Sequence, residues 1–275
     1  TGKVSFTMPS ATKGGETLSG NINYKVYLDD QKKEGTAAAG KTVQLDATLP
    51  EGRCKIVVTT SNAKGESERA ATSLWIGKDA PATVSRLSLK RTLDKGLQLR
   101  WDAVSTGAHN GYVDPASVTY KVVRQPDAKT MSESTTSTVL YDNVESGELA
   151  KYWYEVTPSA YGKSGETLAS NKVVVGPGKA TPYSENFEKQ EAFDYFTVLD
   201  ANNDSKTWSY NEYSQTAEYA GDATVKADDW LILPPLKLNK SGYYKVTFNV
   251  RCNSQNKHLL AVALGNLPEA ENMTT

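Results

Sequence analysis

The sequence predicts an all-β protein built from sandwich domains. Apolar and polar residues alternate with a period of two in short stretches, turn residues separate these stretches, and none sustains a helical period over three turns. One pattern occurs twice in the first two thirds of the chain, and a different pattern fills the remainder. We therefore expect three domains, at residues 1–79, 80–178 and 179–275.

The alternating stretches are the expected strands. In residues 243–251, the side chains of Tyr244, Val246, Phe248 and Val250 would face one way and polar side chains the other, as in a strand with one buried face. The same alternation occurs in Val4–Met8, Asn23–Leu28, Gly96–Trp101, Thr119–Arg124 and Tyr152–Val156.

Residues 1–79 and 80–178 carry the same landmarks. Phe6 in the first copy corresponds to Trp101 in the second, and Tyr24 corresponds to Tyr120 at nearly the same spacing. Each copy closes with a strand and a linker that contains glycine and proline. Because such linkers limit the angle between domains, we expect the two copies to act as spacers.

On these landmarks the two copies resemble fibronectin type III domains, which are Ig-like sandwiches. The resemblance implies that Tyr154 is the corner tyrosine, whose hydroxyl would bond a nearby backbone group. Cys54 is expected at the equivalent place in the first copy, where that bond would be missing. Nothing in the first copy matches Ala82–Lys90, so its first strand is missing and we expect the sequence to be a monomeric fragment of a longer chain.

The third segment has a different character. It contains ENFE, VLDANND, the block DDWLILPPLKL and an alternating stretch after Gly242. Together these resemble the cleaved-adhesin or choice-of-anchor domains of bacterial surface proteins, which are jelly rolls. The resemblance implies that residues 179–275 form a partial jelly-roll β-sandwich, the N-terminal part of such a domain.

The stretch KADDWLILPPLKL, residues 226–238, carries two acids in front of an apolar strand. We expect Trp230 and Ile232 to supply a buried face, and the two consecutive prolines to end regular pairing. Asp228 and Asp229 have two interpretations, which both stay open: solvated or turn-capping residues, or metal ligands.

A second acidic loop offers oxygen atoms at alternate positions, as calcium prefers: Asp200, Asn202 and Asp204. It is not an EF-hand, because the sixth position is not glycine. The other interpretation is an Asx-rich turn, in which such side chains bond their own backbone. Related jelly rolls often hold a structural calcium near such acids, so the candidate calcium ligands are these three residues together with Asp228 and Asp229; we expect no other cofactor.

The sequence offers little for catalysis. Neither of its two histidines, His109 and His258, has a cysteine or a second histidine at ligand spacing, which disfavours zinc. No nucleophile elbow surrounds any serine, and two small sandwiches offer few clefts of the size that a hydrolase needs. We expect no enzymatic activity, and we expect His109 at an exposed hairpin tip.

Composition limits the partners. The 31 basic and 32 acidic residues leave a formal charge of -1, so nothing points to nucleic acid or to an anionic membrane surface. No stretch approaches the ~18 apolar residues of a membrane span, so we expect no membrane insertion. Together with the resemblance, this places the protein among secreted or bacterial outer-surface proteins.

Aromatic residues among polar neighbours are the remaining functional clue. Tyr210, Tyr213 and Tyr219 lie in such a stretch, where their rings would stack on sugars, anchor a protein contact or fill the jelly-roll core. Our first hypothesis is a non-catalytic surface adhesion protein that binds a host protein or glycan. The alternatives are a carbohydrate-binding accessory region of a polysaccharide-degrading enzyme and a structural C-terminal region of a secreted protease.

Overall fold

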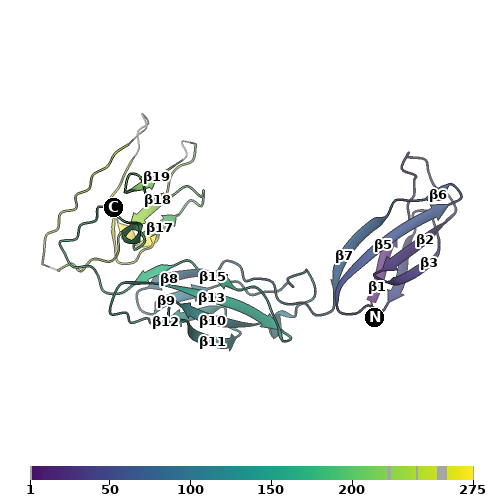
Figure 1. Cartoon of the computed structure of the whole chain (residues 1–275), viewed down its shortest axis with the longest axis horizontal. Helices are drawn as coiled ribbons and strands as arrows, with labels where there is room; N and C mark the ends of the chain where they lie inside the picture. Colours follow the sequence, from purple (N-terminus) through teal and green to yellow (C-terminus); the bar gives the residue numbers. More distant parts are fainter. Residues whose placement is uncertain (1, 222–223, 240, 253–258, 275) are drawn as a thin grey trace.

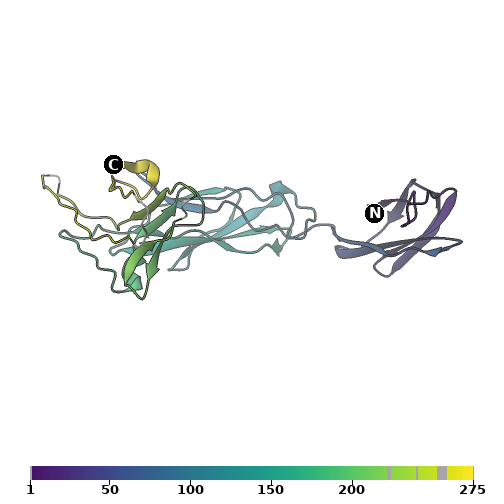
Figure 2. The same ribbon diagram turned by 90° about the horizontal axis from the view of Figure 1, so that it is seen from above.

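The computed structural model describes an elongated, nearly all-β chain. The first sandwich lies at one end, the second lies in the middle, and the third segment lies at the far end (Figures 1 and 2). Among the residues described, no helix is long and apolar enough to cross a membrane. The described residues are 2–221, 224–239, 241–252 and 259–274.

The first sandwich has one two-stranded and one five-stranded sheet. Among the described residues, β1 pairs with β4 alone, while β2 lies between β3 and β5, and β5 also pairs with β6 and β7. The predicted alternation is confirmed, because every second residue of β2 is buried. The strands are β1 (Gly2–Thr7), β2 (Asn21–Leu28), β3 (Gln31–Ala38), β4 (Thr42–Ala47), β5 (Gly52–Asn62), β6 (Gly65–Glu66) and β7 (Ala70–Ile76).

The second sandwich has one three-stranded and one six-stranded sheet. β9 lies between β8 and β12, and β10 lies between β11 and β13, which also pairs with β14, β15 and β16. This division of strands between two sheets is that of a fibronectin type III-like sandwich. The strands are β8 (Ser88–Thr92), β9 (Gly96–Arg100), β10 (Thr119–Gln125), β11 (Lys129–Thr135), β12 (Val139–Asp142), β13 (Ala150–Ala160), β14 (Lys163–Ser164), β15 (Leu168–Ala169) and β16 (Val173–Val175), with a 3₁₀ turn at Pro115–Ser117.

The two sandwiches share one core arrangement. The rings of Phe6 and Tyr24 meet edge to face with centroids 5.3 Å apart, and those of Trp101 and Tyr120 do so at 5.4 Å. Edge-to-face contact is a favoured geometry for aromatic pairs. The pairing of these landmarks between the copies is therefore confirmed.

The predicted position of the corner residue in the first copy is wrong. Val58 of β5 and Val156 of β13 face equivalent residues of their neighbouring strands, so the strands align there. Two residues earlier, Tyr154 is therefore equivalent to Ile56 and not to Cys54. Spacing along the sequence misaligned these positions because the turns before the two strands differ in length. Ile56 has no hydroxyl, so the first copy still lacks the bond.

The hydroxyl of Tyr154 also bonds a different group from the one expected. It donates to Asp142 Oδ2 at 2.5 Å, a side chain and not a backbone group. Arg124 Nη1 donates to the same oxygen at 2.7 Å, and the guanidinium also pairs with Asp127. Burial, and then the bond to Asp142, raise the pKa of Tyr154 well above its ordinary value, so the phenol stays protonated and donates.

The described part of the third segment forms three separate two-stranded pairings. Phe193 and Phe196 are buried beside Phe187, which gives the segment a small aromatic core. A closed jelly roll needs more strands than these, so that assignment stays a prediction. The elements are α1 (Gln190–Phe193), β17 (Thr197–Asp200) paired with β20 (Asp229–Ile232), β18 (Trp208–Asn211) paired with β19 (Thr216–Tyr219), and β21 (Leu264–Gly265) paired with β22 (Met273–Thr274), with a 3₁₀ turn at Ala270–Asn272.

The strand expected at residues 243–251 does not form. No strand is assigned there, and the side chains expected to be buried are exposed: Val246 by 68%, Phe248 by 55% and Val250 by 72%. The physical reason is that no strand among the described residues pairs with this stretch, and a strand's amide groups need a neighbour.

Candidate functional site

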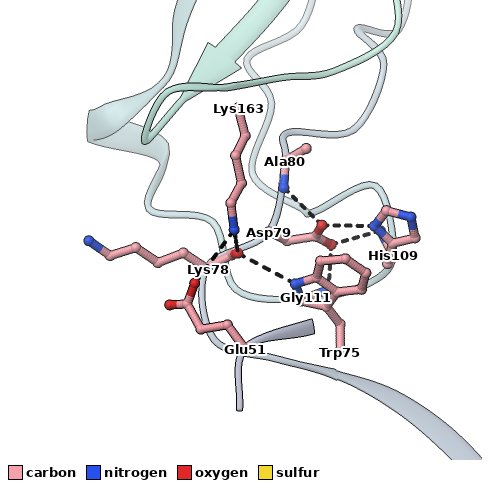
Figure 3. A network of polar contacts seen from close by, with 8 residues as sticks. All are labelled: Glu51, Trp75, Lys78, Asp79, Ala80, His109, Gly111 and Lys163. Atoms are coloured by element: carbon pink, nitrogen blue, oxygen red, sulfur yellow. Dashed lines mark hydrogen bonds and ion pairs between the residues drawn. The ribbon is translucent and has the colours of Figure 1, made fainter. Parts of the chain in front are cut away.

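The linker between the two sandwiches is built around a buried carboxylate (Figure 3). Asp79 has a fully buried side chain, which accepts hydrogen bonds from the backbone N–H of Ala80 at 2.8 Å, His109 at 2.7 Å and Gly111 at 3.0 Å. Its second contact with His109 is to Nδ1, at 2.9 Å. Burial raises the pKa of Asp79, but the hydrogen bonds hold it below its ordinary value of 3.8, so the buried group is charged at neutral pH.

An aromatic stack joins the two sandwiches at the same place. Trp75, in the last strand of the first sandwich, lies flat on the ring of His109, with centroids 4.1 Å apart and planes 10° from parallel. The indole N–H of Trp75 donates to the carbonyl of Lys78 at 3.4 Å. The prediction that His109 is exposed is confirmed, since its side chain is 55% exposed. One face of its ring nevertheless packs on Trp75, which the sequence did not predict.

Two glycines let the loop approach the linker this closely. A Cβ added at Gly107 would overlap the carboxylate of Asp79, and one added at Gly111 would overlap the indole of Trp75. The run TGAHNGY in the sequence carried this signal, since glycine marks a close approach of backbone to another group. What it approached was not readable, because the partner lies 30 residues earlier.

The linker also pairs through its backbone. Asp79 N donates to Tyr112 O at 2.9 Å, and Ala82 N donates to Thr106 O at 2.9 Å. Lys163 of β14 reaches back to the carbonyl of Lys78. The linker is therefore held against the second sandwich by hydrogen bonds. We call this contact between the two sandwiches, made by residues 75–82 and the loop at residues 106–112, the joint.

The second linker is held by the proline block of the third segment. Lys179 N donates to Pro235 O at 2.7 Å, and Lys237 N donates to Lys179 O at 2.8 Å. β20 ends at Ile232, before the prolines, as predicted. The residues after the prolines thus connect the third segment to the second sandwich.

Three predicted ligands meet in the third segment. One carboxylate oxygen each from Asp200, Asp204 and Asp229 lies within 4.8 Å of the others. β17 and β20 bring Asp200 opposite Asp229, and the loop after β17 turns Asp204 back toward them. Asp200 also accepts backbone hydrogen bonds from Asp204 at 3.1 Å and Ser205 at 2.8 Å, as in an Asx-rich turn. Both predicted interpretations of the loop therefore have geometric support.

The cluster contains buried oxygen atoms that accept no hydrogen bond of ordinary geometry. Among the described residues these include both carboxylate oxygens of Asp229 and Oδ1 of Asn202. Burial, then the adjacent carboxylate of Asp229, raise the pKa of Tyr219 to about 12. Because buried acceptors without partners are costly and calcium binds oxygen ligands, these residues fit a calcium ion.

Asp228 lies apart from this cluster. Its Oδ1 accepts from the indole N–H of Trp230 at 2.8 Å, and its backbone carbonyl accepts from Ala201 N at 2.9 Å. Its side chain is exposed and does not belong to the carboxylate group described above.

The three predicted tyrosines do not form one exposed row. Tyr213 is 101% exposed at the turn between β18 and β19. Tyr210 packs near Phe193, with centroids 6.1 Å apart, and Tyr219 packs on Trp208 at 5.7 Å. Tyr213 is thus the tyrosine of the three that is free to contact a partner with its whole ring.

Comparisons with known proteins give a likeness in fold alone. No protein family and no curated protein matches the sequence. Among solved structures, the chain is similar to the chicken CNTN1 FN1–FN3 domains, with 12% identity and a TM-score of 0.28, over 64% of this chain and 63% of that one. It is also similar to a two-domain fibronectin type III segment of chicken tenascin, with 10% identity and a TM-score of 0.27, over 64% of this chain and 92% of that one. The fold assignment rests on the strand order described above and not on these low scores.

Proposed function

We propose that the chain is a non-catalytic binding protein, secreted or held on the outer surface of a bacterium. In it, two fibronectin type III-like sandwiches act as a spacer and present the adhesin-type third segment to a host protein or glycan. The observation that carries the proposal is the buried Asp79 in the joint between the sandwiches.

A spacer needs joints that resist bending. Domains joined by a short linker move relative to each other by default, unless the contact between them is specific. Here the carboxylate of Asp79 and the stack of Trp75 on His109 supply specific contacts on both sides of the linker. The backbone pairing of Lys179 with residues 235–237 does the same at the second linker.

The third segment supplies the binding end in this proposal. Tyr213 projects from a hairpin tip, and an exposed aromatic ring is a common anchor for a protein or sugar contact. Asp200, Asp204 and Asp229, with Asn202 beside them, would hold calcium, which would neutralise the carboxylates and brace the loop against β20.

The spacer role is tested by the distance between spin labels placed on the two sandwiches. We expect a narrow distance distribution in the unmodified chain and a broad one in Asp79→Ala, because the joint loses its charged centre. Asp94→Ala, at an exposed turn of the second sandwich, is the matched control. Equally broad distributions in all three proteins would refute a spacer.

The binding role is tested on immobilised host matrix proteins and on a glycan array. We expect the full chain to bind one of these surfaces and Tyr213→Ala to bind it at least several-fold more weakly, with Tyr112→Ala, another exposed tyrosine, unchanged. Binding that is insensitive to Tyr213 would remove the hairpin tip from the proposal.

A further inference from the structure

The loop that closes the joint contains two residues that are prone to a spontaneous chemical change. Asn110 and Gly111 form the single Asn-Gly pair in the sequence. In such a pair, the backbone nitrogen of the glycine attacks the side-chain amide of the asparagine, because glycine has no side chain that obstructs ring closure. The side chain of Asn110 is exposed, so water reaches it.

The geometry of the joint favours both residues of this pair. Asn110 has a φ of 60°, in the left-handed region that asparagine, aspartate and glycine tolerate best. A Cβ at position 111 would overlap the indole of Trp75 and the side chain of Asp79. The close approach that forms the joint therefore places a reactive pair of residues at its centre.

The reaction consumes one water molecule and releases ammonia. The nitrogen of Gly111 loses its proton and forms a bond to Cγ of Asn110, while the side-chain nitrogen of Asn110 takes up a proton and leaves as ammonia. Water then opens the five-membered imide at one of its two carbonyls. One product is aspartate, and the other is isoaspartate, in which the main chain runs through the side chain and is one carbon longer.

The closed joint opposes the first step. At the φ of Asn110 the allowed ψ is about 30–60°, which places the nitrogen of Gly111 on the far side of the Cα–C bond from the side chain that it must attack. Ring closure therefore requires rotation about this bond. The N–H of Gly111 donates to Asp79 Oδ2 at 3.0 Å, and the rotation would break this hydrogen bond (Figure 3).

We propose that Asn110 is a deamidation site that the joint controls. The residue reacts when the joint opens locally, and its isoaspartate product keeps the joint from closing again. This inference rests on the proposed function, because it describes an irreversible release of the same joint that would make the two sandwiches a spacer.

The longer main chain is the reason that the product does not close. The backbone N–H groups of His109 and Gly111 both donate to Asp79, which fixes the spacing between them along the loop. An added carbon between these two donors displaces Gly111, for which Trp75 and Asp79 leave little room. The added negative charge has the smaller effect, because Asn110 is exposed and water and salt screen it.

The first test is the rate of deamidation at Asn110, measured by mass spectrometry of peptides from the full chain after incubation at mildly alkaline pH. We expect this residue to react fastest in the chain unfolded by urea and slowest in the folded chain. Asp79→Ala should react about tenfold faster than the unmodified folded chain, because the hydrogen bond that opposes rotation is lost. Asp94→Ala, at an exposed turn, should react as the unmodified chain does.

Two outcomes of this test would overturn the proposal. Equal rates in the folded and unfolded chains would mean that the joint gives no protection. A rate in Asp79→Ala that is equal to or below that of the unmodified chain would mean that the carboxylate does not protect Asn110, and a lower rate would make it the base that takes the proton of Gly111. If Asp79→Ala fails to fold, Trp75→Ala, which removes the stack on the same loop, replaces it.

The second test is the distance between spin labels on the two sandwiches after the reaction. The isoaspartate form, separated by ion exchange, should give a broad distance distribution. Freshly prepared Asn110→Asp adds the charge without lengthening the main chain and should keep the narrow distribution of the unmodified chain. A narrow distribution in the isoaspartate form would overturn the release of the joint.

The two tests separate this inference from the proposed function. A broad distribution in the unmodified chain would refute the spacer, whereas slow deamidation in that chain would still retain Asn110 as a protected site. A narrow distribution together with equal rates in the folded and unfolded chains would retain the spacer and refute control of Asn110 by the joint.

Discussion

The middle sandwich is closed, and the regions on either side of it are open. Its three-stranded sheet covers a core that includes Leu99 and Trp101, whereas the two-stranded sheet of the first copy leaves a groove over Phe6. The third segment, in the residues that the structure describes, has three separate strand pairs and an exposed apolar stretch. Among the described residues, β8 lies beside β9 in the second sandwich, and no strand occupies the equivalent place beside β1.

The largest effect should come from removing the central aromatic of each sandwich. Trp101→Ala should lower the free energy of unfolding of the second sandwich by about 3–5 kcal/mol, because it leaves a cavity in a closed core. Phe6→Ala should cost the first sandwich roughly half as much, because that ring is only half-buried.

Hydrogen exchange read by mass spectrometry measures the two sandwiches separately in the full chain. The matched control is Leu93→Ala, which removes an exposed apolar side chain from the second sandwich. Equal losses at Trp101 and Phe6 would show that the groove does not weaken the first core.

Calcium should sharpen the contrast between the second sandwich and the third segment. Calcium at a hundred times its Kd should raise the stability of the third segment by about 2.7 kcal/mol and leave the sandwiches unchanged. Asp229→Ala should abolish the shift, because its buried oxygens belong to the cluster.

The neighbouring acid supplies the control for calcium. Asp228→Ala should retain the shift, since its carboxylate bonds Trp230 instead. Thermal unfolding with calcium and then with chelator is the measurement. An equal shift in both variants, or none in the unmodified chain, would rule out the cluster as a calcium site.

The Tyr154 hydroxyl is a smaller difference between the two copies, because the equivalent Ile56 has none. Tyr154→Phe should destabilise the second sandwich by about 2 kcal/mol, because its hydroxyl bonds the charged and buried Asp142. Tyr141→Phe removes an exposed bond to Gln98 in the same sandwich and should change the stability little. Urea unfolding followed by hydrogen exchange measures the stability of both variants. Similar losses of stability in the two variants would mean that the buried hydrogen bond contributes no more than the exposed one.

Much of this contrast was predictable from local pattern. Alternation predicted β1, β2, β9, β10 and β13, and Phe6 and Trp101 were paired correctly between the copies. The stretch 243–251 has the same alternation and yet forms no strand, because pairing depends on a neighbour that local pattern does not describe. The equivalence of Tyr154 with Cys54 failed for a related reason, since register is set by the paired strand and not by spacing alone.

Of the two candidate sites, the sequence predicted the carboxylate cluster of the third segment but not the joint around Asp79. Asp200 and Asp204 were predicted as calcium ligands because their loop offers oxygen atoms at alternate positions, and Asp229 because the resemblance implies calcium near such acids. The structure brings one carboxylate oxygen of each within 4.8 Å of the others. Asp79 was missed, although the sequence shows it in a linker beside proline, because its importance comes from the distant loop that contains His109. A long-range contact of this kind leaves only a weak signal, here the glycines of that loop.

The smallest effect should be a pH dependence of the joint. The pKa of Asp79 lies below its ordinary value of 3.8, so its bonds stabilise the joint above that pH, and this stability is lost as the pH falls through the lower folded value. The fluorescence of Trp75, which stacks on His109, should change as the pH falls below about 4 and the Asp79 bonds are lost. Asp79→Asn should remove the transition, whereas Asp94→Asn should retain it. A transition that persists in Asp79→Asn would assign the acid sensitivity to another group.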